Sequence, residues 1–293
     1  MRCRLVYPQL PMGWDPGDGV IRVLLDNNAI NDLYRSRIGP SVRHALRRLV
    51  KIGRYEVLFT ISQLTELTGL HSDPQHARLV REIKTLSGER LLQVYPHRIR
   101  DELRFGRLSR GRALYSRREA APLIASLHDR SLAAREEVQA TTVKMAFVTR
   151  EKKARLAVRE APEFTAWPKW KKHWDTNRDD VISNWTADEV DRQLDAAFGV
   201  RLDRGRAFDL RRIPTAWYAT AFLLARIRLL TDGTVGLRES DVFDREHFGD
   251  AAYADLLVTS DRAFVKVAYE TGIDRLRVVT FDQWAAEVLA VAR

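Results

Sequence analysis

Four acidic side chains stand at or just beyond the ends of expected β-strands, where their chemistry could combine. In an open parallel sheet the carboxyl ends of the strands meet at one edge, and functional crevices lie beyond that edge. Carboxylates that crowd together raise one another's pKa unless a cation compensates them, and Mg²⁺ prefers oxygen ligands of this kind. A metal held in this way can activate water and neutralise charge on a phosphate. The four acids are Asp26, Glu66, Asp244 and Asp261.

Each of these acids also has a simpler interpretation when it is taken alone. Asp26 and Asp244 are suitable N-caps of the helices that are expected to follow them. Asp261 could form an Asx turn, and Glu66 could be a solvated helix residue. The joint placement of all four at strand ends favours a common site.

The strands and helices that must position these acids alternate along the chain. Short apolar, β-branched runs predict strands, and longer segments with helical periodicity predict helices. Such alternation implies a parallel sheet that helices cover on both faces. The expected strands are 20–25, 55–61, 90–95, 256–259 and 276–280, and the expected helices include 41–52, 74–86, 211–230, 244–254 and 282–292.

A long, charged, helix-periodic segment interrupts the alternation, and strand signals resume after it. We therefore interpret this segment as an insertion into an α/β domain. The expected division is an N-terminal arm at 1–19, the α/β domain at 20–97 and 211–293, and a mainly helical, basic insertion at 98–210.

The charge is unevenly distributed. The 293 residues carry a net charge of +10, of which residues 1–160 hold +13 and residues 161–293 hold −3. This asymmetry indicates an anionic partner, and arginine, which supplies most of the basic residues, suits bidentate phosphate contacts. A genome rich in G and C would explain the arginine excess equally well.

Composition also excludes several classes of protein. A single cysteine, Cys3, rules out an intramolecular disulfide and a zinc site built from several thiolates. P-loop, G-x-S-x-G and H-E-x-x-H motifs are absent. No targeting segment or sufficiently long apolar stretch occurs, so we expect a cytoplasmic protein without membrane contact.

Three sequence blocks resemble the PIN domain family. Residues 20–28 combine a hydrophobic strand, an Asp and, two positions later, the polar Asn28. Residues 61–67 resemble the second block, in which a Glu on a helix joins the site. Residues 244–264 resemble the closing block, in which an Asp opens a helix and a strand ending in Val-Thr-x-Asp delivers the last acid. The blocks cover both parts of the expected α/β domain.

The resemblance implies a three-layer α/β/α sandwich that binds Mg²⁺ or Mn²⁺ and cleaves single-stranded or structured RNA. The expected activity is therefore that of a metal-dependent endoribonuclease. Asn28 and Thr259 would orient ligands or the attacking water. The implied catalytic and metal-binding residues are Asp26, Glu66, Asp244 and Asp261. The role of Asp244 stays open, with Asp255 as its strongest rival and Asp241 and Asp250 as further ones.

Two other functions stay open: a PIN-like nucleic-acid-binding module without catalysis, and a flap-type DNA nuclease. The expected partner is a nucleic acid, with RNA preferred to DNA. The insertion is larger than in compact toxin members of the family, so toxin, RNA-processing and defence roles remain alternatives. An antitoxin-like or other protein partner and a homodimer also remain open.

The basic insertion contains two groups of residues that could hold nucleic acid. Arginines recur from Arg98 to Arg118 and could contact phosphates, although a solvated helical face has the same pattern. Trp167, Trp170 and Trp174 could stack on bases or fill the core of the insertion. His247 is interpreted as a packing or helix-capping residue.

Overall fold

A computed structural model describes residues 19–60, 63, 81–82, 85–88, 90–128, 162–202, 209–236 and 241–292. Within these ranges four strands form one parallel sheet in the order β2-β1-β3-β4. The strands are β1 (Ile21–Leu25), β2 (Tyr55–Leu58), β3 (Leu256–Thr259) and β4 (Arg277–Thr280). The chain is therefore of the α/β class, as the sequence predicted.

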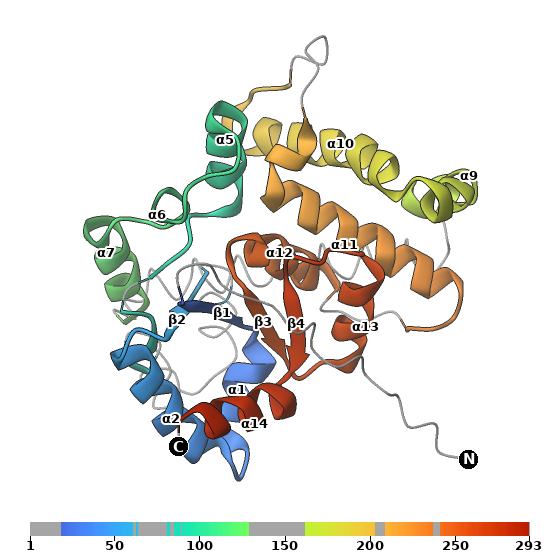
Figure 1. Ribbon diagram of the computed structural model, residues 1–293. Coiled ribbons are helices and arrows are strands. Elements are labelled where there is room, and N and C mark those ends of the chain that lie inside the picture. Colours follow the sequence, from blue (N-terminus) through green and yellow to red (C-terminus); the bar gives the residue numbers. More distant parts are fainter. Residues whose placement is uncertain are drawn as a thin grey trace, which may run out of the picture.

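Alternate residues along each strand face two different hydrophobic cores, because successive side chains point to opposite sides of a sheet. Val23 and Leu25 of β1 face the first core, and Leu24 faces the second. The helices of the first core are α1 (Asn27–Arg35), α2 (Gly39–Lys51) and α14 (Phe281–Val291). Those nearest the sheet in the second are α11 (Pro214–Thr231), α12 (Asp241–Asp250) and α13 (Arg262–Glu270). Helices thus cover both faces of the sheet (Figure 1).

The expected strand at 90–95 is much shorter than predicted. Only isolated bridges form there: Leu91 pairs in parallel with Phe59, and Leu92 pairs antiparallel with Leu114. Tyr95 already begins α5 (Tyr95–Phe105), with proline in its first turn. Proline suits this position because its φ angle is preset for a helix and its missing N–H is not needed there. The segment therefore turns into a helix where apolar content alone suggested a longer strand.

The helices of the inserted segment share a core with the sheet. They are α5, α6 (Arg110–Ala113), α7 (Arg117–His128), α9 (Pro162–Thr176) and α10 (Arg178–Phe198). Trp167 and Trp174 are buried in the same cluster as Leu24 and Leu257 of the sheet. Helices α5, α9 and α10 contact α11, and they lie beyond it from the sheet (Figure 1). The insertion is thus a further layer of the fold.

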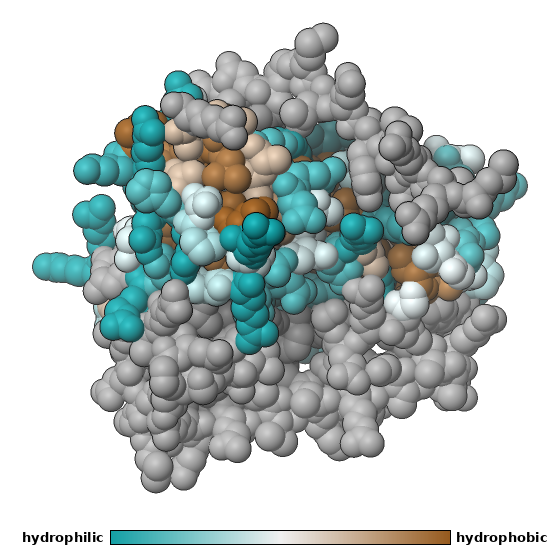
Figure 2. Space-filling view, turned by 90° about the horizontal axis from the view of Figure 1, so that it is seen from below, coloured by the Kyte–Doolittle hydropathy of each residue, from teal (hydrophilic) through white to brown (hydrophobic). Residues whose placement is uncertain are grey.

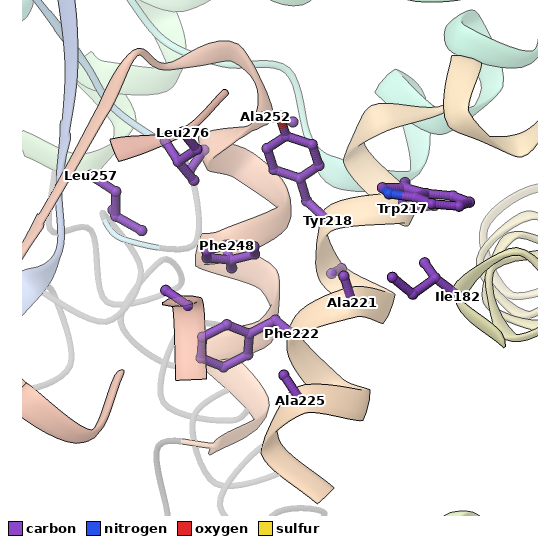
Figure 3. Close-up of a cluster of buried hydrophobic side chains, with 14 of the residues drawn as sticks. Ile182, Trp217, Tyr218, Ala221, Phe222, Ala225, Phe248, Ala252, Leu257 and Leu276 are labelled. Carbon is purple, nitrogen blue, oxygen red and sulfur yellow. The ribbon is translucent and has the colours of Figure 1, made fainter. Parts of the chain in front are cut away.

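Helix α11 is apolar because it is enclosed on opposite sides. Figure 3 shows Phe222 directed toward Phe248 of α12, while Trp217 and Ala221 lie nearer Ile182 of α10. At Gly249 of α12 an added Cβ would lie only 2.8 Å from the Thr215 carbonyl oxygen, so glycine allows α12 to approach α11 closely. The short helices η1 (Leu210–Arg212) and η2 (Ala251–Tyr253) flank this pair in the sequence.

The outer surface near α2 and α14 is mixed in character. These helices lie at the lower edge of Figure 1, and the view from that side in Figure 2 shows brown hydrophobic residues among teal hydrophilic ones. Ile52 and Val291 are among the exposed large hydrophobic residues of the chain. Among the described helices, none is both long and apolar enough to cross a bilayer.

Candidate functional site at the carboxyl ends of β1 and β3

Asp26 stands between β1 and α1, and its carboxyl group is buried, with 5% of the residue exposed. Its backbone N–H donates to the Val258 carbonyl of β3 at 2.9 Å. Its Oδ1 caps α1 by accepting a hydrogen bond from the Ala29 N–H at 2.7 Å, and its Oδ2 accepts one from the Thr259 hydroxyl. Asp26 is therefore both an N-cap and a strand-end carboxylate, which were alternative interpretations of the sequence.

Asp261 occupies the equivalent place after β3. It caps α13, because its Oδ1 accepts hydrogen bonds from the backbone N–H groups of Ala263 at 2.7 Å and Phe264 at 3.3 Å. The Asp261 N–H donates to the Thr259 hydroxyl oxygen at 3.0 Å. Since this hydroxyl also donates to Asp26, Thr259 connects the two acids directly. Thr259 thus lies where a residue that orients these acids would lie, and its expected role toward a ligand or water stays a prediction.

The sheet topology gives this place a special character. From β1 the chain continues to β2 on one side, whereas β3 continues to β4 on the other. The strand order therefore reverses between β1 and β3, and open α/β sheets bind ligands at such a switch point. Asp26 and Asp261 lie at the carboxyl ends of these two neighbouring strands.

The electrostatics of Asp26 show that charged groups gather around it. Burial raises the pKa of Asp26 to about 6. Hydrogen bonds from Thr259 and Ala29 and the charge of His247 lower this pKa, while the negative charge of Asp261 raises it. A buried carboxylate with a raised pKa at a switch point is a functional-site candidate.

Helix α12 brings further polar residues toward this edge. His247 is buried and interacts electrostatically with Asp26. Asp244 is half-buried and lies three residues before His247, so both occupy the same face of α12. Asp244 lies on this helix but does not open it as predicted, because α12 already begins at Asp241. The burial of His247 agrees with its interpretation as a packing residue, but no sequence pattern indicated its electrostatic effect on Asp26.

Glu66 lies outside the described residues, but the segment that leads to it is anchored at the site. The Gln63 amide donates a hydrogen bond to the Leu25 carbonyl, directly before Asp26. Thr60 and Gln63 also bond reciprocally: the Thr60 N–H donates to Gln63 Oε1 at 3.0 Å and the Gln63 N–H to Thr60 Oγ1 at 3.1 Å. The same T-x-x-Q spacing forms a capping box at Thr280, so this spacing was a usable sequence signal.

The three rivals of Asp244 lie in different places. Asp255 stands at the amino end of β3, opposite the site, where its Oδ2 accepts the Arg22 N–H at 2.9 Å. Asp250 forms a buried ion pair with Arg98 of α5. The side chain of Asp241 lies outside the described residues. Asp255, the strongest rival by sequence, is thus held at the wrong end of its strand to join Asp26.

One further contact at this edge was not foreseen. The Ser260 hydroxyl donates a hydrogen bond to Asp32 Oδ2 of α1. It fixes the turn between Thr259 and Asp261 against α1.

Asn28, expected to support the site, is exposed on the first turn of α1.

The described residues contain no group of three or more His, Cys, Asp or Glu side chains arranged to hold a metal ion. Two carboxylates are nevertheless compatible with Mg²⁺, which commonly binds through one or two carboxylates, several waters and substrate phosphates. Burial is the main cause of the raised pKa of Asp26 and the negative charge of Asp261 adds to it, so a bound cation would offset both effects. The donors present at this edge therefore fit a weakly held divalent ion.

The inserted segment excludes Arg98 from the arginines that could contact phosphates and, for Trp167 and Trp174, confirms the alternative that they fill the core. Arg98 is fully buried, so it cannot belong to a phosphate-binding surface. Trp167 and Trp174 pack edge to face in the core, with ring centroids 5.9 Å apart, and cannot stack on bases. Their helical spacing placed them on one face, and that face is directed inward.

Comparisons with protein-family models, with curated proteins and with solved structures each found no significant match to this chain. The resemblance of its three sequence blocks to PIN domains therefore stays a prediction.

Proposed function

We propose that this protein is a metal-dependent nuclease of PIN-like α/β/α architecture that hydrolyses phosphodiester bonds in RNA. The observation that carries the proposal is the pairing of buried Asp26 with Asp261 at the topological switch point, with Thr259 bonded to both. A parallel sheet with helices on both faces is compatible with this architecture.

Asp26 and Asp261 would hold Mg²⁺ or Mn²⁺, with Glu66 and Asp244 as the further acidic residues. The ion would supply a polarised water and compensation for the negative charge of the phosphodiester. Thr259 keeps the Asp26 carboxylate oriented, because its hydroxyl donates a hydrogen bond to Asp26 Oδ2. His247 adds an imidazole beside Asp26, and this charge favours the ionised carboxylate that metal binding requires.

The direct test is cleavage of labelled single-stranded RNA and DNA by the purified full chain with Mn²⁺, Mg²⁺ or EDTA. Asp26→Asn and Asp261→Asn should each reduce metal-dependent cleavage by about 1,000-fold or more. Asp255→Asn is the matched control, because it removes a carboxylate at the opposite end of β3, and it should retain activity. Full activity of either site variant would refute the assignment.

A binding module without catalysis is the second candidate. It is favoured by the absence, among the described side chains, of a group of three metal ligands. It predicts RNA binding that persists in EDTA and no cleavage with either ion. Preference for branched DNA over RNA would instead support the flap-type nuclease.

A further inference from the structure

An exposed phenylalanine at the end of α5 is surrounded by arginines. Phe105 is 54% exposed, although most large apolar side chains that the structure describes are buried. The guanidinium carbon of Arg112, from α6, lies 4.9 Å from its ring centroid, and that of Arg104 lies 5.6 Å away. Both distances are typical of cation–π contacts. Two segments of the chain therefore contribute to one flat, positively charged surface.

The turn after Phe105 brings a third arginine to this surface. Gly106 has a φ angle of 73° and ends α5. A Cβ at Gly106 would lie 2.9 Å from a guanidinium nitrogen of Arg212, so this side chain lies against the glycine backbone. Arg107 is directed the other way, onto the Tyr253 ring, and donates to the Ala252 carbonyl at 3.1 Å. This second contact fixes the loop on the body of the protein.

The charge of this surface is not neutralised by neighbouring acids within the described ranges. Arg104, Arg112 and Arg212 form no ion pair with any described carboxylate. Other exposed arginines do: Arg47 pairs with Glu82, and Arg201 pairs with Asp195 at 3.0 Å. Surface arginines that lack acidic partners attract polyanions.

We propose that Phe105, with Arg104, Arg112 and Arg212, is a binding platform for single-stranded nucleic acid. An unpaired base stacks on the phenyl ring or on the guanidinium plane that covers it, and the arginines contact the flanking phosphates. Stacking on a π surface tolerates any base, and the exposed guanidinium groups can rotate from the ring to a phosphate. The proposal deepens the proposed function, because it names the surface that holds the substrate of that nuclease.

The platform lies away from the proposed catalytic edge. Arg107 anchors it to η2, which leads into the amino end of β3, whereas Asp26 and Asp261 lie at the carboxyl ends of β1 and β3. The four residues of β3 span about 13 Å. A strand that reaches both places must therefore be several nucleotides long, and its binding can be measured separately from cleavage.

The test measures binding without cleavage, so it is independent of whether the protein is a nuclease. The full chain carrying Asp26→Asn is titrated, in EDTA, into fluorescein-labelled single-stranded RNA and DNA 12-mers, and fluorescence anisotropy gives Kd. Phe105→Ala should weaken binding about 5- to 150-fold, the range expected when one base no longer stacks on an aromatic ring. Phe105→Trp keeps an aromatic ring at this position, so its Kd should be close to that of the chain with Phe105. The Kd values for the RNA and the DNA 12-mer show whether the platform prefers ribose or deoxyribose.

The arginines are tested by salt dependence. The slope of log K against log salt concentration should become shallower by about 0.7 for each phosphate of a single strand that the protein no longer neutralises. Arg104→Ser/Arg112→Ser should therefore reduce the slope by about 1.4. The matched controls Tyr269→Ala, a second exposed aromatic residue, and Arg47→Ser/Arg201→Ser should change neither Kd nor slope.

An unchanged Kd for Phe105→Ala, or an absence of binding to either oligonucleotide, would overturn the platform proposal. Circular dichroism confirms that each variant folds. Absence of cleavage by the native chain, with platform binding intact, would refute the nuclease proposal alone.

Discussion

Asp26 at the sheet edge and Glu102 on α5 are both buried carboxylates whose pKa is raised by burial, to about 6 and about 7. Their surroundings differ. Glu102 accepts hydrogen bonds from the Thr215 hydroxyl, the Thr215 N–H and the Tyr253 hydroxyl, at 2.6, 3.2 and 2.6 Å, and Arg98 adds a positive charge. Asp26 likewise accepts hydrogen bonds, from the Thr259 hydroxyl and the Ala29 N–H, and has the charge of His247 nearby, but it also has a second carboxylate, Asp261, in its vicinity.

This difference separates a structural polar interface from a candidate active site. At Glu102 the protein supplies donors from α11 and η2 and a cation from α5, so the buried group is compensated internally. At Asp26 hydrogen bonds and the charge of His247 compensate the buried carboxylate in part, while the negative charge of Asp261 opposes its ionisation, and an external cation would offset that repulsion. Raised pKa values alone do not distinguish the two places, but the identity of the neighbours does.

The largest effect is expected where the structural interface loses its buried cation. Arg98 is fully buried and pairs with Asp250, so Arg98→Met leaves a buried aspartate without this cation. The free energy of unfolding should fall by about 3–5 kcal/mol in urea titrations. Arg98→Met/Asp250→Leu should recover much of this loss. Arg201→Met, at an exposed pair, should change stability by about 0.5 kcal/mol or less. A small loss for Arg98→Met would show that the interface is not a stabilising element.

The next largest effect is a gain in stability, expected when the buried carboxylate of Asp26 is removed. The Asp26 carboxyl has a pKa of 3.8 when unfolded and about 6 when folded. Below pH 3.8 it is protonated in both states, whereas above pH 6 the folded chain must ionise a buried group, and stability is lost. In EDTA, Asp26→Asn should therefore be as stable as the native chain near pH 4 and more stable by up to about 3 kcal/mol above pH 7.

Thermal melts between pH 4 and 8 measure this difference, and Asp282→Asn, at an exposed position on α14, is the control. Mn²⁺ should stabilise the native chain and reduce the gap. A stability difference that does not vary with pH would contradict the burial argument for Asp26.

The sequence predicted the strand-end acids well because strand identity and chain order determine them. Asp26 and Asp261 follow short β-branched runs, and parallel pairing then brings them to one edge. The sequence could not distinguish buried from exposed faces of long helices, so Arg98 was grouped with exposed arginines, and base stacking and core packing both stayed open for Trp174. Asp255 was misleading because it directly precedes β3. A residue before a strand and a residue after it lie at opposite ends of that strand, a full strand length apart.

His247 and Phe105 show the same limit from the other direction. No local pattern marks a histidine of a helix as a residue whose charge acts on Asp26, since that electrostatic interaction joins α12 to the end of β1. Phe105 is a typical core residue by type, and only the turn at Gly106 leaves its ring exposed beside Arg112. Both depend on contacts between segments that are distant in the sequence.

A smaller effect is expected from the hydroxyl that joins the two acids. Thr259→Val keeps the shape of a buried side chain but removes the donor to Asp26 Oδ2. This donor lowers the pKa of Asp26, so its loss should raise that pKa further and weaken Mn²⁺ binding about 10- to 100-fold in calorimetric titrations. Thr259→Ser retains the hydroxyl and should bind Mn²⁺ nearly as the native chain does. Equal weakening in both variants would point to packing and against orientation of the carboxylate.

Thr215→Val is the matched change at the structural interface and should have the smallest effect. It removes one hydroxyl donor from Glu102, while the Thr215 N–H and the Tyr253 hydroxyl remain. Unfolding free energy should fall by about 1 kcal/mol at pH 8 and by less at pH 5, because hydrogen bonds to an ionised carboxylate are stronger than those to a neutral one. Mn²⁺ affinity should stay unchanged. Both threonines donate a hydrogen bond to a buried carboxylate. A loss of metal binding from Thr259→Val alone would therefore identify the β1–β3 edge as the metal site. Equal losses from both variants would make the proposed distinction between the two regions untenable.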